Sequence, residues 1–80
     1  RVHFLAEKGV VDAVFDKFGE GVKIYEHDAD TISFAVDVQV SSPFLAWVIG
    51  FGESLKVTSP QSVIDELKLR IKASLKNYEG

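Results

Sequence analysis

The residues able to do chemistry are few and scattered along this 80-residue chain. Its two histidines, His3 and His27, lie far apart in the sequence, and there is no cysteine to act as a nucleophile, a metal ligand or a disulfide partner. No HExxH, GxSxG or Walker motif occurs. Asp28 and Asp30 flank one residue without the other ligands of a calcium loop, so we expect a solvated turn there. We therefore predict no catalytic residue, no metal site and no cofactor.

Composition limits the classes of protein to which the chain can belong. With 46% hydrophobic and 26% charged residues, it is not expected to be disordered, and its length predicts one domain over residues 1–80. The net charge of −3 argues against generic binding to duplex DNA. The longest apolar run, 44–51, is far shorter than the ~20 residues that span a bilayer, and no signal sequence opens the chain. We expect a cytoplasmic protein and, since the chain begins at Arg1 without a methionine, a piece of a longer one.

Hydrophobic periodicity predicts the elements that must position these residues. A period of two predicts strands over about 2–5, 22–27, 31–39 and 55–58. Spacings of three and four predict helices over about 7–18, 42–49 and 60–78, the last two opened by Ser-Pro pairs. This order is typical of an α+β ferredoxin-like (RNP-type) βαββαβ sandwich with an added C-terminal helix. Right-handed crossovers then place the first and third strands in the centre of an antiparallel sheet.

The sheet face away from the helices is a candidate binding surface. RNP-type domains stack bases on aromatic side chains from this face. The alternation of the strands places four chemically able side chains there, which are His3, Lys23, Tyr25 and His27. We interpret them as a candidate site for a ligand or single-stranded nucleic acid, with an ordinary solvated or interfacial face as the alternative.

The helix over 42–49 is apolar on nearly every side, although a helix on a sheet needs only one apolar stripe. Leu45 and Ile49 lie one turn apart on one flank, and we interpret them as interface residues that meet another domain or subunit. The alternative is complete burial beneath the C-terminal helix.

The C-terminal helix carries an apolar and a basic pattern. A stripe at helical spacing predicts a buried face made by Val63, Ile64, Leu67, Ile71, Leu75 and Tyr78. Lys68, Lys72 and Lys76 share another stripe and form a candidate basic ridge facing phosphates. The alternative for this ridge is stabilisation of the helix C-terminus, where the macrodipole favours cations.

One stretch resembles a known family. The apolar helix ending in Phe51-Gly52, the following strand with its proline, and the long last helix resemble the C-terminal extension, called WCX, of bacterial WYL-domain transcriptional regulators. The matching residues are Trp47, Phe51, Gly52, Leu55, Val57, Pro60 and Tyr78. The first half of the chain agrees loosely, so the resemblance covers the whole chain.

The resemblance implies a non-catalytic module that supports dimerisation and the response to an effector. It implies that the parent protein carries a WYL domain and an N-terminal helix-turn-helix, that it is a homodimer, and that it contacts DNA through the helix-turn-helix. Two alternatives remain: a free-standing nucleic-acid-binding domain that uses the open sheet face, and a small-ligand-binding module that pairs edge to edge.

Overall fold

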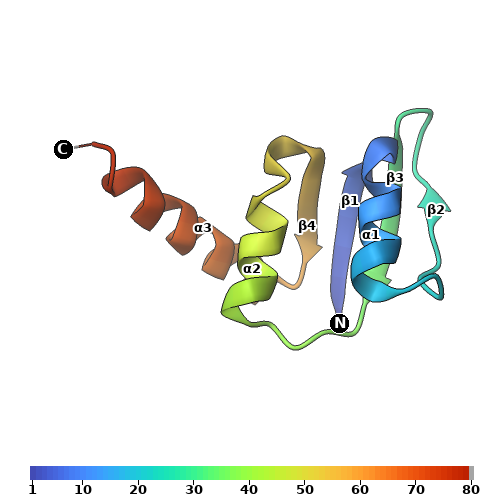
Figure 1. Cartoon of the computed structure of the whole chain (residues 1–80), viewed down its shortest axis with the longest axis horizontal. Coiled ribbons are helices and arrows are strands. Elements are labelled where there is room, and N and C mark those ends of the chain that lie inside the picture. Colours follow the sequence, from blue (N-terminus) through green and yellow to red (C-terminus); the bar gives the residue numbers. More distant parts are fainter. Residues whose placement is uncertain (80) are drawn as a thin grey trace.

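The computed structural model describes residues 1–79 and shows an α+β chain with a four-stranded antiparallel sheet and three helices. In Figure 1, α1 and α2 lie on one face of the sheet, while α3 extends away from the rest of the chain toward the C-terminus. The elements are β1 (Val2–Glu7), the 3-10 turn η1 (Lys8–Val10), α1 (Val11–Phe18), β2 (Tyr25–Glu26), β3 (Thr31–Val36), α2 (Ser42–Ile49), the 3-10 turn η2 (Gly52–Ser54), β4 (Leu55–Ser59) and α3 (Gln61–Lys76).

The strand order is β2-β3-β1-β4, so the first and third strands lie in the centre, as the sequence predicts. Phe4 of β1 pairs with Phe34 of β3 and with Val57 of β4. The rings of Phe4 and Phe34 stack with centroids 4.8 Å apart, and the ring of Phe44 in α2 meets Phe4 edge-on. The centre of the core is therefore an aromatic contact between the sheet and α2.

The core is entirely apolar over residues 1–79, since no polar or charged residue there is buried. Alternate residues of each long strand face the helices, and the helices contribute one side each. The buried side chains are Val2, Phe4, Ala6, Val10, Val14, Ile32, Phe34, Val36, Phe44, Leu45, Val48, Leu55, Val57, Val63 and Leu67.

The predicted strand over 22–27 is wrong in extent, because β2 contains only Tyr25 and Glu26. Gly19 ends α1 at a φ of 91°, a conformation that glycine adopts without a Cβ clash. Val22 and Ile24 then pack half-buried against the core instead of following β3. Because these two side chains pack toward the core, residues 22–24 do not pair with β3, and pairing begins at Tyr25.

The predicted bounds of α2 are correct, but its capping residue differs from the prediction. Ser41, rather than Ser42, is the N-cap, and its Oγ accepts a hydrogen bond from the Phe44 amide at 3.3 Å. Before α3, Pro60 occupies the N-cap position and supplies no side-chain hydrogen bond.

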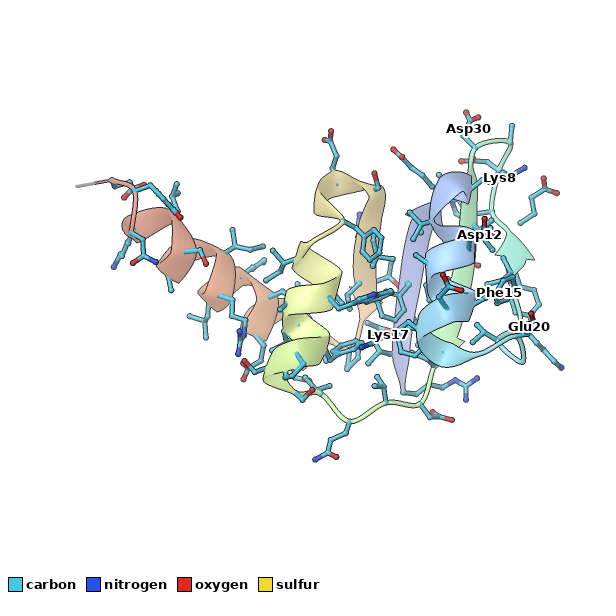
Figure 2. The ribbon with its side chains drawn as sticks, viewed as in Figure 1. Lys8, Asp12, Phe15, Lys17, Glu20 and Asp30 are labelled. Atoms are coloured by element: carbon cyan, nitrogen blue, oxygen red, sulfur yellow. The ribbon has the colours of Figure 1, made fainter. Side chains whose placement is uncertain are left out.

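The turn between β2 and β3 is built by Asp28. Its Oδ1 accepts hydrogen bonds from the amides of Asp30 and Thr31, each at 2.9 Å, and these bonds lower the pKa of the carboxyl below its ordinary value. Nearby, Lys8 donates its amide to the Asp30 carbonyl and its Nζ to Glu26. Figure 2 shows Lys8 and Asp30 together at this end of the sheet. The polar turn predicted from sequence is thus stabilised by hydrogen bonds from its own backbone amides to the Asp28 side chain.

Candidate functional site

The structure brings His3 and Tyr25 together on the open face of the sheet. Tyr25 pairs with Ser33, and His3 pairs with Ala35 two residues further along β3. Ser33 and Ala35 are small, so they form the floor of a shallow hollow of about 230 Å³ between the imidazole and the phenol. Both His3 and Tyr25 are exposed, and Arg1 and Thr58 complete the polar rim. The hollow offers one flat aromatic surface, one imidazole and one guanidinium to a ligand.

Lys23 and His27 do not join this hollow. Lys23 precedes β2 and lines a neighbouring hollow at the edge of the sheet. His27 follows β2 and donates its amide to the Thr31 carbonyl at 3.0 Å, so its backbone belongs to the turn at the far end of the sheet. Tyr25 therefore lines one hollow with His3 and the neighbouring hollow with Lys23, while His27 lies apart in the turn.

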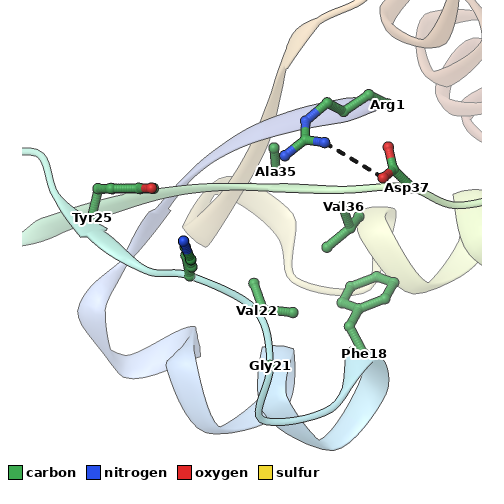
Figure 3. Close-up of a pocket in the computed structure, with 9 residues that line it drawn as sticks. Arg1, Phe18, Gly21, Val22, Tyr25, Ala35, Val36 and Asp37 are labelled. Atoms are coloured by element: carbon green, nitrogen blue, oxygen red, sulfur yellow. Dashed lines mark hydrogen bonds and ion pairs between the residues drawn. The ribbon is translucent and has the colours of Figure 1, made fainter.

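The neighbouring hollow exists because β2 is short. It occupies about 530 Å³ beside the unpaired part of β3, between that strand and the segment after α1. Figure 3 shows Phe18, Val22 and Val36 at its base, with Arg1 and Asp37 joined above them at 3.4 Å. Sequence reasoning missed this ion pair. The register of the strands could have indicated it. Val2 pairs with Val36 in an antiparallel arrangement, so Arg1 before Val2 lies opposite Asp37 after Val36.

The ionisable side chains of both hollows are exposed. Catalytic groups with shifted pKa values are normally buried or closely coupled to another charge. No carboxylate lines the hollow of His3, and the carboxylate of Asp37 is 77% exposed beside an exposed guanidinium. Both hollows are therefore open surfaces rather than enclosed clefts.

Leu45 is 4% exposed and belongs to the core, so its prediction as an interface residue is wrong. It lies in the corner where α2 meets Val63 at the start of α3, which covers that flank. The other flank of α2 is covered by α1, since the rings of Trp47 and Phe18 meet edge-on with centroids 5.3 Å apart. Ile49 is only half-buried and lines a groove between α2, β4 and α3.

That groove is lined mainly by apolar side chains. It occupies about 570 Å³, and α2, β4 and the side of α3 form its walls. Glu53, Lys56 and Lys68 stand at its polar margins. Its apolar lining is made by Val48, Ile49, Leu55, Val57, Ile64, Leu67 and Ile71.

The second half of α3 leaves its apolar stripe uncovered. Val63 and Leu67 are buried as predicted, but Ile71 and Leu75 of α3 and Tyr78, just beyond its end, are 51%, 55% and 88% exposed. The prediction that these three residues are buried is wrong, because the helix moves away from the sheet after its second turn (Figure 1). Periodicity in the sequence identifies the apolar stripe, but it does not show how far along the helix the core extends.

The basic stripe lies on this same projecting helix. Lys68, Lys72 and Lys76 are all exposed. Arg70 instead turns back toward α2, where it donates a hydrogen bond to the Ser42 hydroxyl. No helix in residues 1–79 has the length and apolar character that crossing a membrane would require.

Comparison with protein families gives one match: the WCX domain model, over residues 1–75. Neither the curated proteins nor the solved structures contain a match to the chain. WCX is a regulatory-type domain and is not a known enzyme family. The family match spans β1 through nearly the whole of α3, including the groove and most of the exposed stripe. The chain therefore belongs to the WCX domain family.

Proposed function

We propose that this WCX domain is a non-catalytic regulatory module of a cytoplasmic, WYL-type bacterial transcriptional regulator with a helix-turn-helix. In this proposal it supports dimerisation of the regulator and its response to an effector, while another domain contacts DNA. The observation that carries the proposal is the family match over residues 1–75. The open, shallow hollows and the uncovered apolar stripe on α3 support it, because they are features of a contact surface rather than of a reaction site.

The fold supports the same assignment. The strand order β2-β3-β1-β4 and the placement of α1 and α2 on one face favour a ferredoxin-like sandwich, with α3 as the added helix. Such a sandwich leaves one sheet face and one appended helix free for contacts with neighbouring domains.

The test uses the full regulator from which the chain derives. Deleting residues 1–80 should reduce its mass in light scattering from that of a dimer toward that of a monomer and weaken operator binding, since two half-sites are then bound independently. An unchanged mass and unchanged operator affinity would overturn the dimerisation role. A reading frame without an upstream helix-turn-helix would overturn the regulator assignment as a whole.

A second candidate function is favoured by the exposed ring of Tyr25 beside His3 on the open face, because an exposed aromatic ring can stack on a base. Stacking on one aromatic side chain contributes about 1–3 kcal/mol, whereas a Kd of 1 mM needs about 4.1 kcal/mol. We therefore expect this face alone to bind single-stranded nucleic acid more weakly than 1 mM.

Fluorescence anisotropy of a labelled oligonucleotide with the 80-residue chain measures this affinity. Micromolar binding that is lost in Tyr25→Ala and kept in Tyr78→Ala would make the open face the principal site. Tyr78 is a matched control because it is exposed and lies just beyond the end of α3, away from the sheet.

A further inference from the structure

The hollow beside the unpaired part of β3 combines an apolar base with a charged rim. We call this place the edge hollow. Phe18, Val22 and Val36 form its base, as Figure 3 shows. Its volume of about 530 Å³ lies within the range of about 300–1,000 Å³ that small-molecule sites occupy. The edge hollow is therefore large enough for a small organic molecule with an apolar body.

Three charged side chains line the edge hollow, and together they leave one positive charge in excess. Arg1 forms an ion pair with Asp37 at 3.4 Å, so these two charges offset each other. Lys23 also lines the hollow and is exposed, and it forms no ion pair with a carboxylate among residues 1–79. The hollow therefore carries one cation that a ligand with a single negative charge can neutralise.

The edge of β3 adds backbone groups to this cation. In antiparallel strands, the amide and carbonyl of alternate residues point toward the same neighbouring strand. The Thr31 carbonyl accepts a hydrogen bond from the His27 amide on the β2 side, so Ser33 and Ala35 also face that side. Pairing with β2 ends at Ser33, which leaves Ala35 without a strand partner on that side within the described chain. Because Ala35 lines the edge hollow, its amide is a donor available to an anion there.

We propose that the edge hollow binds a small monovalent carboxylate with an apolar, ring-sized body. The carboxylate contacts Lys23, and the body lies over Phe18 and Val22. This inference rests on the effector response proposed above, and it names the chemical class of the effector and its place in the domain.

The apolar base and one wall of the hollow favour a body with a ring. Phe18 and Val22 are only half-buried, so part of each side chain is accessible from the hollow. The ring of Tyr25 is 59% exposed and forms a flat wall beside them. A planar body between this wall and the base removes apolar surface of both from water, and aromatic rings add favourable edge and face contacts.

The charges of the rim favour a carboxylate over a phosphate. A phosphate monoester carries about two negative charges at pH 7, whereas Lys23 is the one lining cation outside the ion pair of Arg1 and Asp37. The second charge would lie near the carboxylate of Asp37, which repels it. A carboxylate carries a single charge, which Lys23 alone neutralises.

Nuclear magnetic resonance titration of the 80-residue chain with phenylacetate tests the proposal. We expect saturable shifts at the amides of residues 22–25 and of Ala35, with a Kd of about 1 mM for so small a probe at an open site. Phenylacetamide lacks the charge and should bind about twofold to fivefold more weakly, as expected for loss of an exposed ion pair. Acetate lacks the ring and should give no saturable shifts. Tighter binding of phenyl phosphate than of phenylacetate would overturn the carboxylate class.

Charge reversal separates the contact with Lys23 from the net charge of the chain. Lys23→Glu should weaken phenylacetate binding at least about tenfold, because it removes an attraction and adds a repulsion. Lys72→Glu is the matched control, since it makes the same change of charge on α3, where Lys72 is exposed and lines no part of the edge hollow. Both replaced side chains are exposed, so circular dichroism of both variants should match the wild type. Equal weakening by the two variants would overturn the site.

The remaining outcomes separate this site from the proposed regulatory function. A wild-type chain that shows no saturable shifts up to about 10 mM phenylacetate, ten times the expected Kd, would overturn the site. Shifts confined to the groove between α2, β4 and α3 would overturn it as well, because the ligand would then occupy the wrong hollow. In either case the deletion in the full regulator would still decide the dimerisation role by itself.

Discussion

The two helices α2 and α3 show opposite relations between composition and exposure. α2 is apolar on nearly every side, yet the sheet, α1 and α3 cover most of its surface. α3 has the regular stripe of an amphipathic helix, yet half of that stripe is exposed. The difference teaches that apolar content does not determine which helix is free for contacts. What determines it is how much of the helix length is covered by neighbouring elements.

The neighbours of α2 come from three directions. Phe44 meets the ring of Phe4 on the sheet, Trp47 meets Phe18 of α1, and Leu45 faces the start of α3. Beyond Leu67, no side chain of α3 is buried among residues 1–79, although Arg70 still donates a hydrogen bond to Ser42. The sequence predicts uncovered apolar side chains on α2, whereas the structure has them on α3.

The comparison predicts its largest effect at matched leucines in the two helices. Leu45→Ala should lower the free energy of unfolding by about 2–5 kcal/mol, because it leaves a cavity in the core. Leu75→Ala should change it by no more than about 0.5 kcal/mol. Urea denaturation followed by circular dichroism measures both. Equal losses would show that the second half of α3 packs against its own chain.

A smaller effect is expected at the aromatic contact that covers the outer flank of α2. A double-mutant cycle of Phe18→Leu and Trp47→Leu should give a coupling energy of about 0.5–1.5 kcal/mol, as edge-on aromatic pairs do. Trp47 is the sole tryptophan, so its fluorescence should also shift in Phe18→Leu. A coupling energy near zero would mean that α1 only lies near α2 without stabilising it.

The N-termini of the helices sharpen the comparison further. Ser41→Ala should cost about 1 kcal/mol, because the Phe44 amide loses its side-chain acceptor. The neighbouring Ser42→Ala is the control: it removes the acceptor of the Arg70 guanidinium at an exposed site and should cost less than Ser41→Ala. Thermal unfolding of the two variants compares them, and the reverse order would place the cap at Ser42.

The smallest effect concerns pH and lies outside both helices. The lowered pKa of Asp28 means that its carboxylate stabilises the fold above its ordinary pKa and that this contribution is lost as pH falls through the lowered value. Asp28→Asn should therefore be less stable than the wild type near pH 7, and the difference should shrink in acid. Urea midpoints across this pH range provide the measurement. A difference that is constant with pH would assign the turn's stability to geometry rather than charge.

The sequence predicts the elements and central strands well because these depend on local spacing. The alternation of Phe4 with His3 and of Phe34 with Ser33 identifies the two faces of the sheet correctly. The boundaries at Gly19 and before Pro43 follow from backbone preferences of single residues.

The errors arise where the burial or pairing of a residue depends on parts of the chain that are distant in sequence. Alternation extends the second strand back to Val22, but Val22 packs beside Phe18 and draws that segment away from β3. Leu45 was assigned to the surface because periodicity does not show that Val63 reaches it. His27 was placed beside Tyr25 by the same overlong strand, whereas Lys23 does line a hollow with Tyr25. His3 was positioned correctly by a strand with neighbours on both sides.

The central position of β1 has a consequence during synthesis. The ribosome makes β1 first, and β3 follows to cover one of its edges, but β4 appears about 20 residues after β3 ends. At 5–20 residues per second, the other edge of this apolar strand stays unpaired for roughly 1–4 s. Throughout that interval the nascent chain presents a template on which another unfinished chain can form a strand. Completion of β4 closes that edge, so its arrival ends the period in which misassembly competes with folding.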